Sequence, residues 1–288
     1  MTFLLADSGS TKTLWHLQHD NGSSATLSTQ GLPPRLTSDE QFHAVLNRVT
    51  EAFEGEVANP FQLFFYGSGC GSSAQCDRYT HLLRSHWPQA SQVYVASDLL
   101  GACRATFADS NGLVGIIGTG SNACRYAADA VETSSPSLGY LLGDEGSGCA
   151  LGIQIWRLYW NRQLPDHLTN AFHELFPLSL PEFLDRVYMQ PYPNRFLASA
   201  VPFLANYRNE PTIRDILDSQ WRQYFTTMVK PLVSDTKEQL ALVGGVAAQF
   251  EDELRQAASI YCPELSVVKV LSDPVSDLIA YHVNHQLK

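Results

Sequence analysis

Apolar and polar positions alternate in short blocks from the start of the chain. Phe3-Leu4-Leu5-Ala6 is an apolar strand that runs into the turn-rich segment Asp7-Ser8-Gly9-Ser10. Residues 12–18 predict a second strand, which ends at the hairpin signal Asp20-Asn21-Gly22. Residues 24–29 follow as a third strand, so the chain opens with three strands joined by turns.

Helical spacing follows the third strand. Apolar residues recur every three or four positions between residues 37 and 53, and Thr37 or Ser38 is placed to cap this helix. The next elements are predicted as strand 62–66, helix 79–87, strand 93–95 and helix 99–106. The first part of the chain therefore has the order β-β-β-α-β-α-β-α.

The pattern restarts near residue 113. A strand, a glycine turn and a return strand are followed by a long helical region that prolines interrupt. The elements are strand 113–117, turn Gly118–Ser121, strand 123–127, helical region 147–230, strand 240–243, helix 246–261, strand 267–271 and helix 274–286, and the longest linker is the loop at 131–137. Two α/β units that open alike indicate an internal duplication.

Composition narrows the class of protein. The 288 residues are 44% hydrophobic and 17% charged, which is typical of a folded chain, and at about 150 residues per domain they suggest two domains. The net charge of −10 disfavours nucleic acid and anionic membranes as partners. An anionic ligand must therefore be held by local backbone N–H groups or by a metal.

Signals for export or membrane insertion are missing from the sequence. The opening residues have no basic region, and the longest uncharged apolar stretch, 197–207, is too short to span a bilayer. The six cysteines form no C-x-x-C pair, so we interpret them as reduced thiols. We expect a cytoplasmic protein.

The segment from Asp7 to Thr13 is the first candidate for chemistry. Its Lys12-Thr13 tail resembles the end of a P-loop, but Thr11 precedes the lysine and a strand follows, so the P-loop interpretation fails. Its backbone N–H groups and hydroxyls can face a phosphate, and Asp7 can hold a metal through water. The alternative is an ordinary hairpin turn that Asp7 caps.

Two further small-residue turns have the same character. Gly118-Thr119-Gly120-Ser121-Asn122 occupies the equivalent place in the second unit, and Gly244-Gly245 lies between a strand and a helix. Either can let the backbone approach a phosphate or nucleotide closely. Each can also be a structural turn, but three such sites in this order are more specific than one.

These turns, together with Gly143-Asp144-Glu145-Gly146-Ser147, resemble the motifs of N-acetylglucosamine kinases, in the BadF/BadG-type branch of the actin–hexokinase–Hsp70 ATPase superfamily. The likeness covers essentially the whole chain. It implies an α/β fold of two ribonuclease-H-like domains, 1–112 and 113–273, that close over an interdomain cleft holding ATP, Mg²⁺ and a sugar. It also implies that the C-terminal helix, 274–288, packs back on the first domain.

The resemblance also implies roles for individual residues. Asp98 ends a strand and precedes a helix, so by itself it reads as an N-cap, and by resemblance it is the catalytic carboxylate that accepts the proton of the sugar hydroxyl. Asp7 is the implied metal ligand. The implied phosphate and nucleotide ligands are Ser8, Gly9, Ser10, Thr11, Lys12, Thr13, Gly118, Thr119, Gly120, Ser121, Gly244 and Gly245, and the implied sugar ligands are Asp98, Thr119, Gly139, Tyr140 and Asp144.

Two departures from the family pattern fall on the sugar side. The family usually carries an aromatic residue where this chain has Leu138, and an asparagine in the loop that here contains Pro33 and Pro34. A site that lacks such partners discriminates less between similar sugars. We therefore expect a kinase for an amino sugar, N-acetylglucosamine foremost, with looser selectivity than its relatives.

Two other functions compete with this interpretation. An ATPase that drives electron transfer to a dehydratase or reductase would use Cys103 and Cys124 at an iron–sulfur cluster between subunits. A non-catalytic sugar sensor would need a DNA-binding appendage, which the sequence lacks, and repressor-type relatives also carry a zinc-cysteine cluster that is missing here. We expect ATP and a small sugar as partners, and a homodimer.

Overall fold

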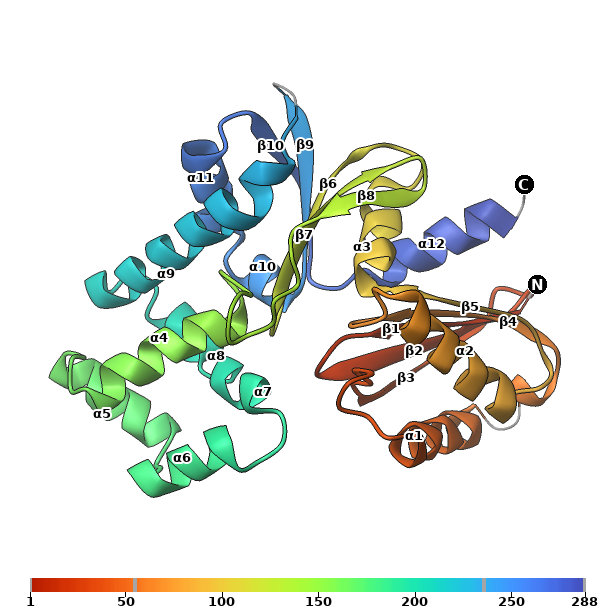
Figure 1. The fold of residues 1–288 in the computed structure, drawn as a ribbon, viewed down its shortest axis with the longest axis horizontal. Helices are drawn as coiled ribbons and strands as arrows, with labels where there is room; N and C mark the ends of the chain where they lie inside the picture. The colour runs from red at the N-terminus through yellow and green to blue at the C-terminus, as the bar shows by residue number, and fades with distance from the viewer. Residues whose placement is uncertain (1, 54–55, 235–236, 287–288) are drawn as a thin grey trace. The chain divides into compact units, whose positions relative to one another are not determined.

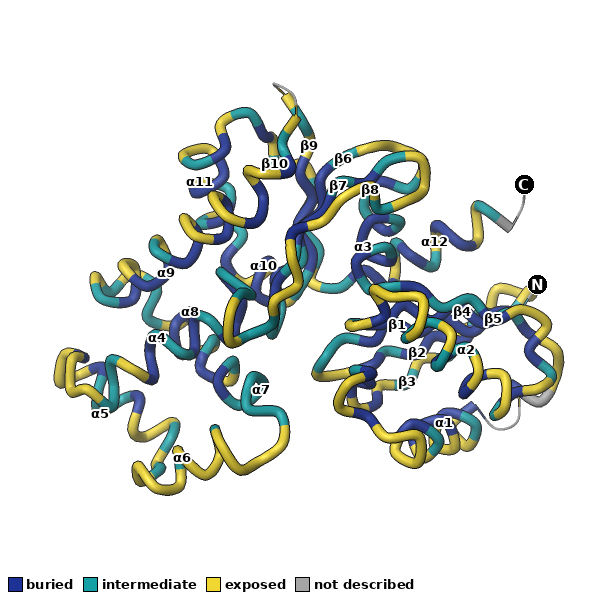
Figure 2. Tube along the Cα trace, viewed as in Figure 1, coloured by how far each residue is buried: buried dark blue, intermediate teal, exposed yellow. Residues whose placement is uncertain are grey.

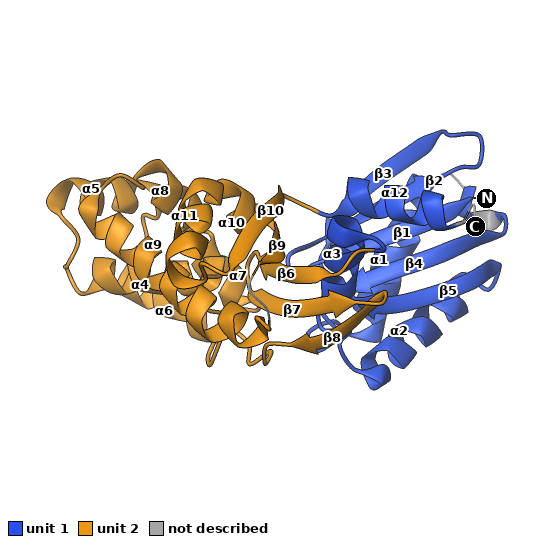
Figure 3. Cartoon of the chain, turned by 90° about the horizontal axis from the view of Figure 1, so that it is seen from above, with its two compact units in different colours: residues 1–109, 274–288 blue, residues 110–273 orange. Residues whose placement is uncertain are grey.

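The computed structural model describes residues 2–53, 56–234 and 237–286. The chain divides into two compact units: unit 1 comprises residues 1–109 and 274–288, and unit 2 comprises residues 110–273 (Figure 3). The chain passes from unit 1 to unit 2 after residue 109, whereas the sequence predicts the domain boundary at residue 112. The C-terminal helix belongs to unit 1, as predicted.

Unit 1 is built on a five-stranded mixed sheet of order β3-β2-β1-β4-β5 (Figure 1). β1 pairs antiparallel with β2 and parallel with β4, and β4 pairs parallel with β5. The elements are β1 (Phe3–Ser8), β2 (Lys12–Gln18), β3 (Ser24–Gln30), α1 (Asp39–Ala52), a 3₁₀ turn (Glu56–Ala58), β4 (Phe61–Gly67), α2 (Ser73–His86), β5 (Ala90–Ser97), α3 (Asp98–Phe107) and α12 (Val275–Gln286).

Both faces of this sheet are covered, so its central strands are apolar throughout. On β1 the even positions Leu4 and Ala6 face the core under α1 and α2, and Trp15 of β2 joins them. The odd position Phe3 faces the side of α3 and α12, which pack against each other in unit 1. The dark stretches of β1 and β4 in Figure 2 reflect this two-sided burial.

The carboxyl ends of the three parallel strands meet at one edge. Ser8 at the end of β1 pairs with Gly67 of β4, and Gly67 pairs with Ser97 of β5. In open α/β sheets the crevice outside these ends is where ligands bind. Asp7, Ser68 and Asp98 lie within one residue of this row.

Unit 2 repeats the topology. Its sheet has the order β10-β9-β6-β7-β8, so β6, β7 and β8 correspond to β1, β2 and β3, and β9 and β10 to β4 and β5. The identical order supports the predicted duplication and confirms the α/β fold class. The sheet elements are β6 (Gly112–Ile117), β7 (Ser121–Ala127), β8 (Ala130–Ser134), β9 (Glu238–Val243) and β10 (Leu265–Leu271), with α10 (Gly245–Gln249) and α11 (Glu251–Tyr261).

A helical insertion separates β8 from β9. It comprises α4 (Gly148–Trp160), α5 (Asp166–Leu175), α6 (Leu180–Tyr188), α7 (Pro193–Ala198), α8 (Val201–Asn206), α9 (Pro211–Gln223), a π-helical segment (Tyr224–Val229) and a 3₁₀ turn (Lys230–Leu232). Prolines stand in the first turns of four of these helices, where their missing N–H has no helical partner to lose. Within the described ranges, no helix is long and apolar enough to cross a membrane.

Candidate active site

The turn between β1 and β2 is fixed by its own buried hydroxyls. Ser8 Oγ and Thr13 Oγ1 lie 2.8 Å apart, and Thr13 Oγ1 donates to the carbonyl of Gln30 at 3.1 Å. Gly9 N–H closes the turn on the carbonyl of Lys12 at 3.0 Å. Ser8 and Thr13 are fully buried, whereas Thr11 and Lys12 at the tip are exposed. The buried pair shapes the turn, and its tip faces solvent.

Asp98 directly follows β5, which is separated from β1 in the sheet by β4. Its Oδ1 accepts the N–H of Leu99 at 2.9 Å, and the hydroxyl of Ser68 donates to the same carboxyl. Ser68 N–H in turn donates to the carbonyl of Ser8 at 2.7 Å, which ties the ends of β1, β4 and β5 together. Burial raises the pKa of Asp98 to about 6, and these hydrogen bonds limit the rise.

The helix-capping interpretation of Asp98 is wrong. Ser97 is the N-cap of α3, because its hydroxyl accepts the N–H of Leu100 at 3.2 Å, and Asp98 is the first helical residue. Serine and aspartate cap helices about equally well, so only the backbone geometry separates Ser97 from Asp98. The helix therefore does not need Asp98 as its cap.

Asp7 is the predicted ligand of the implied Mg²⁺, and it lies near the end of β1. In the described part of the chain, no group of three or more histidines, cysteines, aspartates or glutamates gathers to hold an ion. Mg²⁺ does not need such a cage, since it is commonly held by one or two carboxylates together with waters and substrate phosphates. A half-buried carboxylate at the foot of a small-residue turn fits a nucleotide-bound Mg²⁺.

In unit 2, the turn at 118–121 and the loop at 143–147 lie against each other. Gly148 N–H donates to the carbonyl of Gly118 at 2.8 Å, and Cys149 N–H to that of Thr119 at 3.0 Å. Ser121 Oγ donates to the carbonyl of Glu145 at 2.7 Å. Two motifs more than twenty residues apart in sequence thus form one structure.

Asp144 is the carboxylate of this structure. Its backbone is left-handed, with φ of 58°, and its carboxyl accepts the N–H of Ser121. A Cβ on Gly120 would lie 2.9 Å from Asp144 Oδ2, so the turn and the carboxylate are in direct contact. Burial raises the pKa of Asp144. The predicted sugar ligand therefore sits directly over a predicted phosphate turn.

The other predicted sugar ligands lie just before Asp144. Gly139 has a positive φ of 75° and accepts the N–H of Gly143 at 2.9 Å, which folds the loop back on itself. Tyr140 lines a hollow of about 420 Å³, together with Glu145 and Gln220. Leu138, at the position of the family's aromatic residue, is 59% exposed.

The two glycines after β9 differ from each other. Gly244 has φ of 126°, and a Cβ there would lie 2.4 Å from the carbonyl oxygen of Ile117, so only glycine fits. Nothing lies within 4 Å of a Cβ on Gly245. Gly244 therefore packs tightly against Ile117 at the end of β6, whereas a side chain at position 245 would extend into open space.

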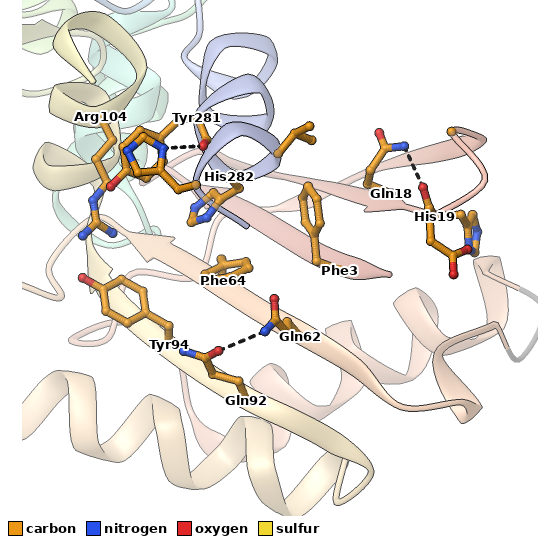
Figure 4. Close-up of a pocket in the computed structure, with 14 residues that line it drawn as sticks. Phe3, Gln18, His19, Gln62, Phe64, Gln92, Tyr94, Arg104, Tyr281 and His282 are labelled. Carbon is orange, nitrogen blue, oxygen red and sulfur yellow. Dashed lines mark hydrogen bonds between the residues drawn. The ribbon is translucent and has the colours of Figure 1, made fainter. Parts of the chain in front are cut away.

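A hollow in unit 1 is lined by none of the predicted site residues. It measures about 680 Å³ and lies between the sheet and α12 (Figure 4). Phe3 and Phe64 of the sheet and His282 of α12 line it, and the ring of His282 stacks on Phe64 with centroids 3.9 Å apart. Gln62 Nε2 donates to Gln92 Oε1 at 3.2 Å along its rim.

Sequence reasoning missed Ser68 and the residues behind the unit 2 loops. Ser68 belongs to the small-residue stretch Gly67-Ser68-Gly69 after a buried strand, and that signal could have marked it. The helix residues Gln220 and Tyr224, which contact the loop at Gly146, carry no comparable local signal.

Comparison with known proteins gives structural relatives. No family model matches the chain, and neither does any curated protein. The crystal structure of a "Putative N-acetylglucosamine Kinase" from Porphyromonas gingivalis is 31% identical with a TM-score of 0.89, and the match covers 99% of both chains.

More distant structures share the fold. A second "Putative N-acetylglucosamine Kinase", from Chromobacterium violaceum, is 19% identical with a TM-score of 0.72, over 97% of this chain and 98% of that one. A ROK family glucokinase from Streptomyces griseus, solved with glucose and AMPPNP, is 13% identical with a TM-score of 0.60 over the whole of both chains. From the identity and coverage shared with the Porphyromonas gingivalis protein, we conclude that this chain belongs to the N-acetylglucosamine kinase family of sugar kinases.

Proposed function

We propose that the protein transfers the γ-phosphoryl group of ATP to N-acetylglucosamine, giving N-acetylglucosamine 6-phosphate. The observation that supports this most is the carboxyl of Asp98, which is held by Ser68 and Leu99 at the row of strand ends beside the 8–13 turn. The names of the similar structures agree with a sugar kinase.

Asp98 suits the role of proton acceptor. Phosphoryl transfer requires little covalent chemistry from the protein, so one positioned carboxylate that takes the hydroxyl proton is sufficient. A pKa of about 6 keeps Asp98 mostly ionised at neutral pH and makes it a stronger base than an ordinary aspartate. The attacking hydroxyl loses its proton to Asp98 while its oxygen bonds to the γ-phosphorus, and the bond from that phosphorus to the bridging oxygen of ADP breaks, so that ADP leaves.

Charge on the phosphates must be neutralised locally, because the chain carries a net charge of −10. Asp7 would hold Mg²⁺, which supplies positive charge to the phosphate oxygens when bound. We assign Gly9, Ser10, Thr11 and Lys12 to the phosphates through their backbone N–H groups and, for Lys12, its ammonium group. Ser8 and Thr13 shape the turn from inside.

The unit 2 residues divide between phosphate and sugar. We assign Gly118, Thr119, Gly120 and Ser121 to phosphate, with Thr119 also touching sugar, and Gly244-Gly245 to the nucleotide. Asp144 would accept a hydrogen bond from a sugar hydroxyl, with Gly139 and Tyr140 forming the adjacent wall. The exposed Leu138 offers no ring for the sugar to stack on, which supports looser selectivity.

The electron-transfer alternative finds no support in the burial of its cysteines. Cys103 and Cys124 are both fully buried. A cluster shared between subunits needs thiols at the surface, where the partner can reach them.

A coupled assay of ADP release tests the proposal. N-Acetylglucosamine, glucosamine, N-acetylmannosamine, N-acetylmuramic acid and glucose are compared at equal concentration, with the Asp98→Asn variant as the control for contaminating kinases. We expect N-acetylglucosamine to give the highest kcat/KM, and the variant to lose turnover with every sugar. Higher kcat/KM with glucose or glucosamine would leave only the statement that the protein is a sugar kinase.

A further inference from the structure

One helix face lies behind both unit 2 loops. α9 runs into the π-helical segment, and Gln220, Tyr224 and Met228 follow each other at intervals of four residues. All three are buried, with exposures of 3% or less. π-helical turns inside α-helices are rare and occur frequently at functional sites.

Tyr224 supports the 118–122 turn. Its hydroxyl donates to the carbonyl of Asn122 at 3.2 Å. A Cβ on Gly115 would lie 2.1 Å from the same hydroxyl oxygen, so β6 admits this phenol only because residue 115 has no side chain. The phenol therefore packs directly against the backbone of β6.

The same helix face supports the loop that carries Asp144. Gly146 N–H donates to Gln220 Oε1 at 3.2 Å in a buried bond. A Cβ on Gly146 would lie 2.8 Å from Tyr224 Cβ, and Gly146 has a φ of 72° that favours glycine. The loop thus packs on Tyr224 two residues after Asp144.

Met228 completes the contact. Its Sδ lies 3.4 Å from Ser121 Oγ, the hydroxyl that also donates to the carbonyl of Glu145. The three helix residues therefore contact the paired loops at Ser121, Asn122 and Gly146, which lie two or three residues after Thr119 and two residues after Asp144.

We propose that Gln220, Tyr224 and Met228 are positioning residues that fix the separation between Thr119 and the Asp144 carboxylate, and so set the affinity for the sugar. The expected effect of these residues on sugar affinity rests on the proposed function. The contacts themselves do not depend on that function, because the structure shows each of them directly. A displacement of about 1 Å in a binding group can cost up to about a hundredfold in rate.

The kinetic test uses Tyr224→Phe, which removes one hydroxyl and keeps the ring. We expect the KM for N-acetylglucosamine to rise by about fivefold or more while kcat changes less, because Asp98 is untouched. Tyr126→Phe is the matched control, since Tyr126 is equally buried on β7 and its hydroxyl donates to Asp129 Oδ1 at 3.0 Å, away from the turn. Gln220→Met should act as Tyr224→Phe does.

A double variant separates positioning from simple destabilisation. If Tyr224 acts through Asp144, adding Tyr224→Phe to Asp144→Asn should raise the sugar KM little further. Fully multiplicative effects of the two substitutions would overturn this part of the proposal.

Hydrogen exchange provides a readout that needs no activity. We expect the amides of Gly146, Gly148 and Cys149 to exchange about tenfold faster in Tyr224→Phe and Gln220→Met, and at the wild-type rate in Tyr126→Phe. Unchanged exchange in both variants would refute the positioning role. A wild-type protein that phosphorylates no sugar, but whose variants exchange faster, would refute the proposed function and leave the positioning role supported.

Discussion

At the scale of single residues, Asp98 combines a functional demand with a cost in stability. Burial favours its protonated form, so its pKa in the fold, about 6, exceeds that of an unfolded chain, about 3.9. The folded state therefore binds the proton more tightly, and it loses stability as the pH rises from about 4 to about 6. At neutral pH, ionised Asp98 destabilises the fold.

Asp98→Asn should consequently separate activity from stability. We expect kcat to fall by roughly a hundredfold or more, because the proton acceptor is lost while the shape is kept. The melting temperature should match or exceed that of the wild type at pH 7, and the difference should vanish near pH 4. Steady-state kinetics and thermal melts at both pH values check this, and a variant with more than about a tenth of wild-type kcat would require another base.

The pH profile of the wild type follows from the same group. Asp98 must be ionised to accept a proton, so kcat/KM should rise with pH and level off above an apparent pKa of about 6. Measurement of initial rates between pH 4.5 and 8.5 tests this range. A kcat/KM that stays nearly constant down to pH 4.5 would point to an ordinary solvated carboxylate instead.

The residues of the site differ in how far the sequence reveals them. Asp7 and Asp98 follow apolar strands, and that pattern sufficed to place both at the carboxyl edge of the sheet. Whether Ser97 or Asp98 caps α3 depends on backbone dihedral angles, which adjacent polar residues do not determine. Ser68 acquires its role only because β4 pairs between β1 and β5.

At the scale of elements, the two glycines of the strand-to-helix turn after β9 have different roles: Gly244 packs against the end of β6, and Gly245 is the predicted nucleotide contact. Gly244→Ala places a Cβ against the carbonyl of Ile117 at a φ that alanine avoids. We expect it to lower the free energy of unfolding by about 1–3 kcal/mol, measured by urea denaturation.

Gly245→Leu is the matched substitution in open space. The fold should stay intact, and the affinity for ATP should fall by about tenfold or more if the adenosine binds at this turn. Titration calorimetry with an ATP analogue measures the affinity, and unchanged binding in a folded variant would remove Gly245 from the nucleotide site.

Most elements could be predicted from periodicity, because buried strands and amphipathic helices have strong patterns. The segment 131–137 is a case where this failed: residues 130–134 form β8, an edge strand whose residues are mostly exposed and therefore lack an apolar signature. The π-helical segment could not be predicted for another reason. Its apolar spacing fits an α-helix, and the wider turn lies where Tyr224 packs against Gly115 of β6 and Gly146 of the 143–147 loop.

At the scale of the whole molecule, an acidic chain that binds a nucleotide must supply positive charge at the site. ATP analogue binding should therefore stabilise the protein more with Mg²⁺ than without it, by up to about 2.7 kcal/mol at a hundredfold excess over Kd. In Asp7→Asn we expect this Mg²⁺-dependent increment in melting temperature to disappear, with the melting temperature of the ligand-free protein little changed. An increment of wild-type size in the variant would assign the metal to other ligands.

The chain returns from unit 2 to unit 1 at residue 274, and this order has a consequence for biosynthesis. Helix α12 covers Phe3 and Phe64 of the first sheet, yet it is made after all of unit 2. At about 5–20 residues per second, roughly 9–36 s separate the synthesis of the first sheet from that of α12. During that interval Phe3 and Phe64 lack the cover of α12, so unit 2 can fold while unit 1 is still incomplete. We expect chaperones that bind apolar surfaces to bind the nascent chain there.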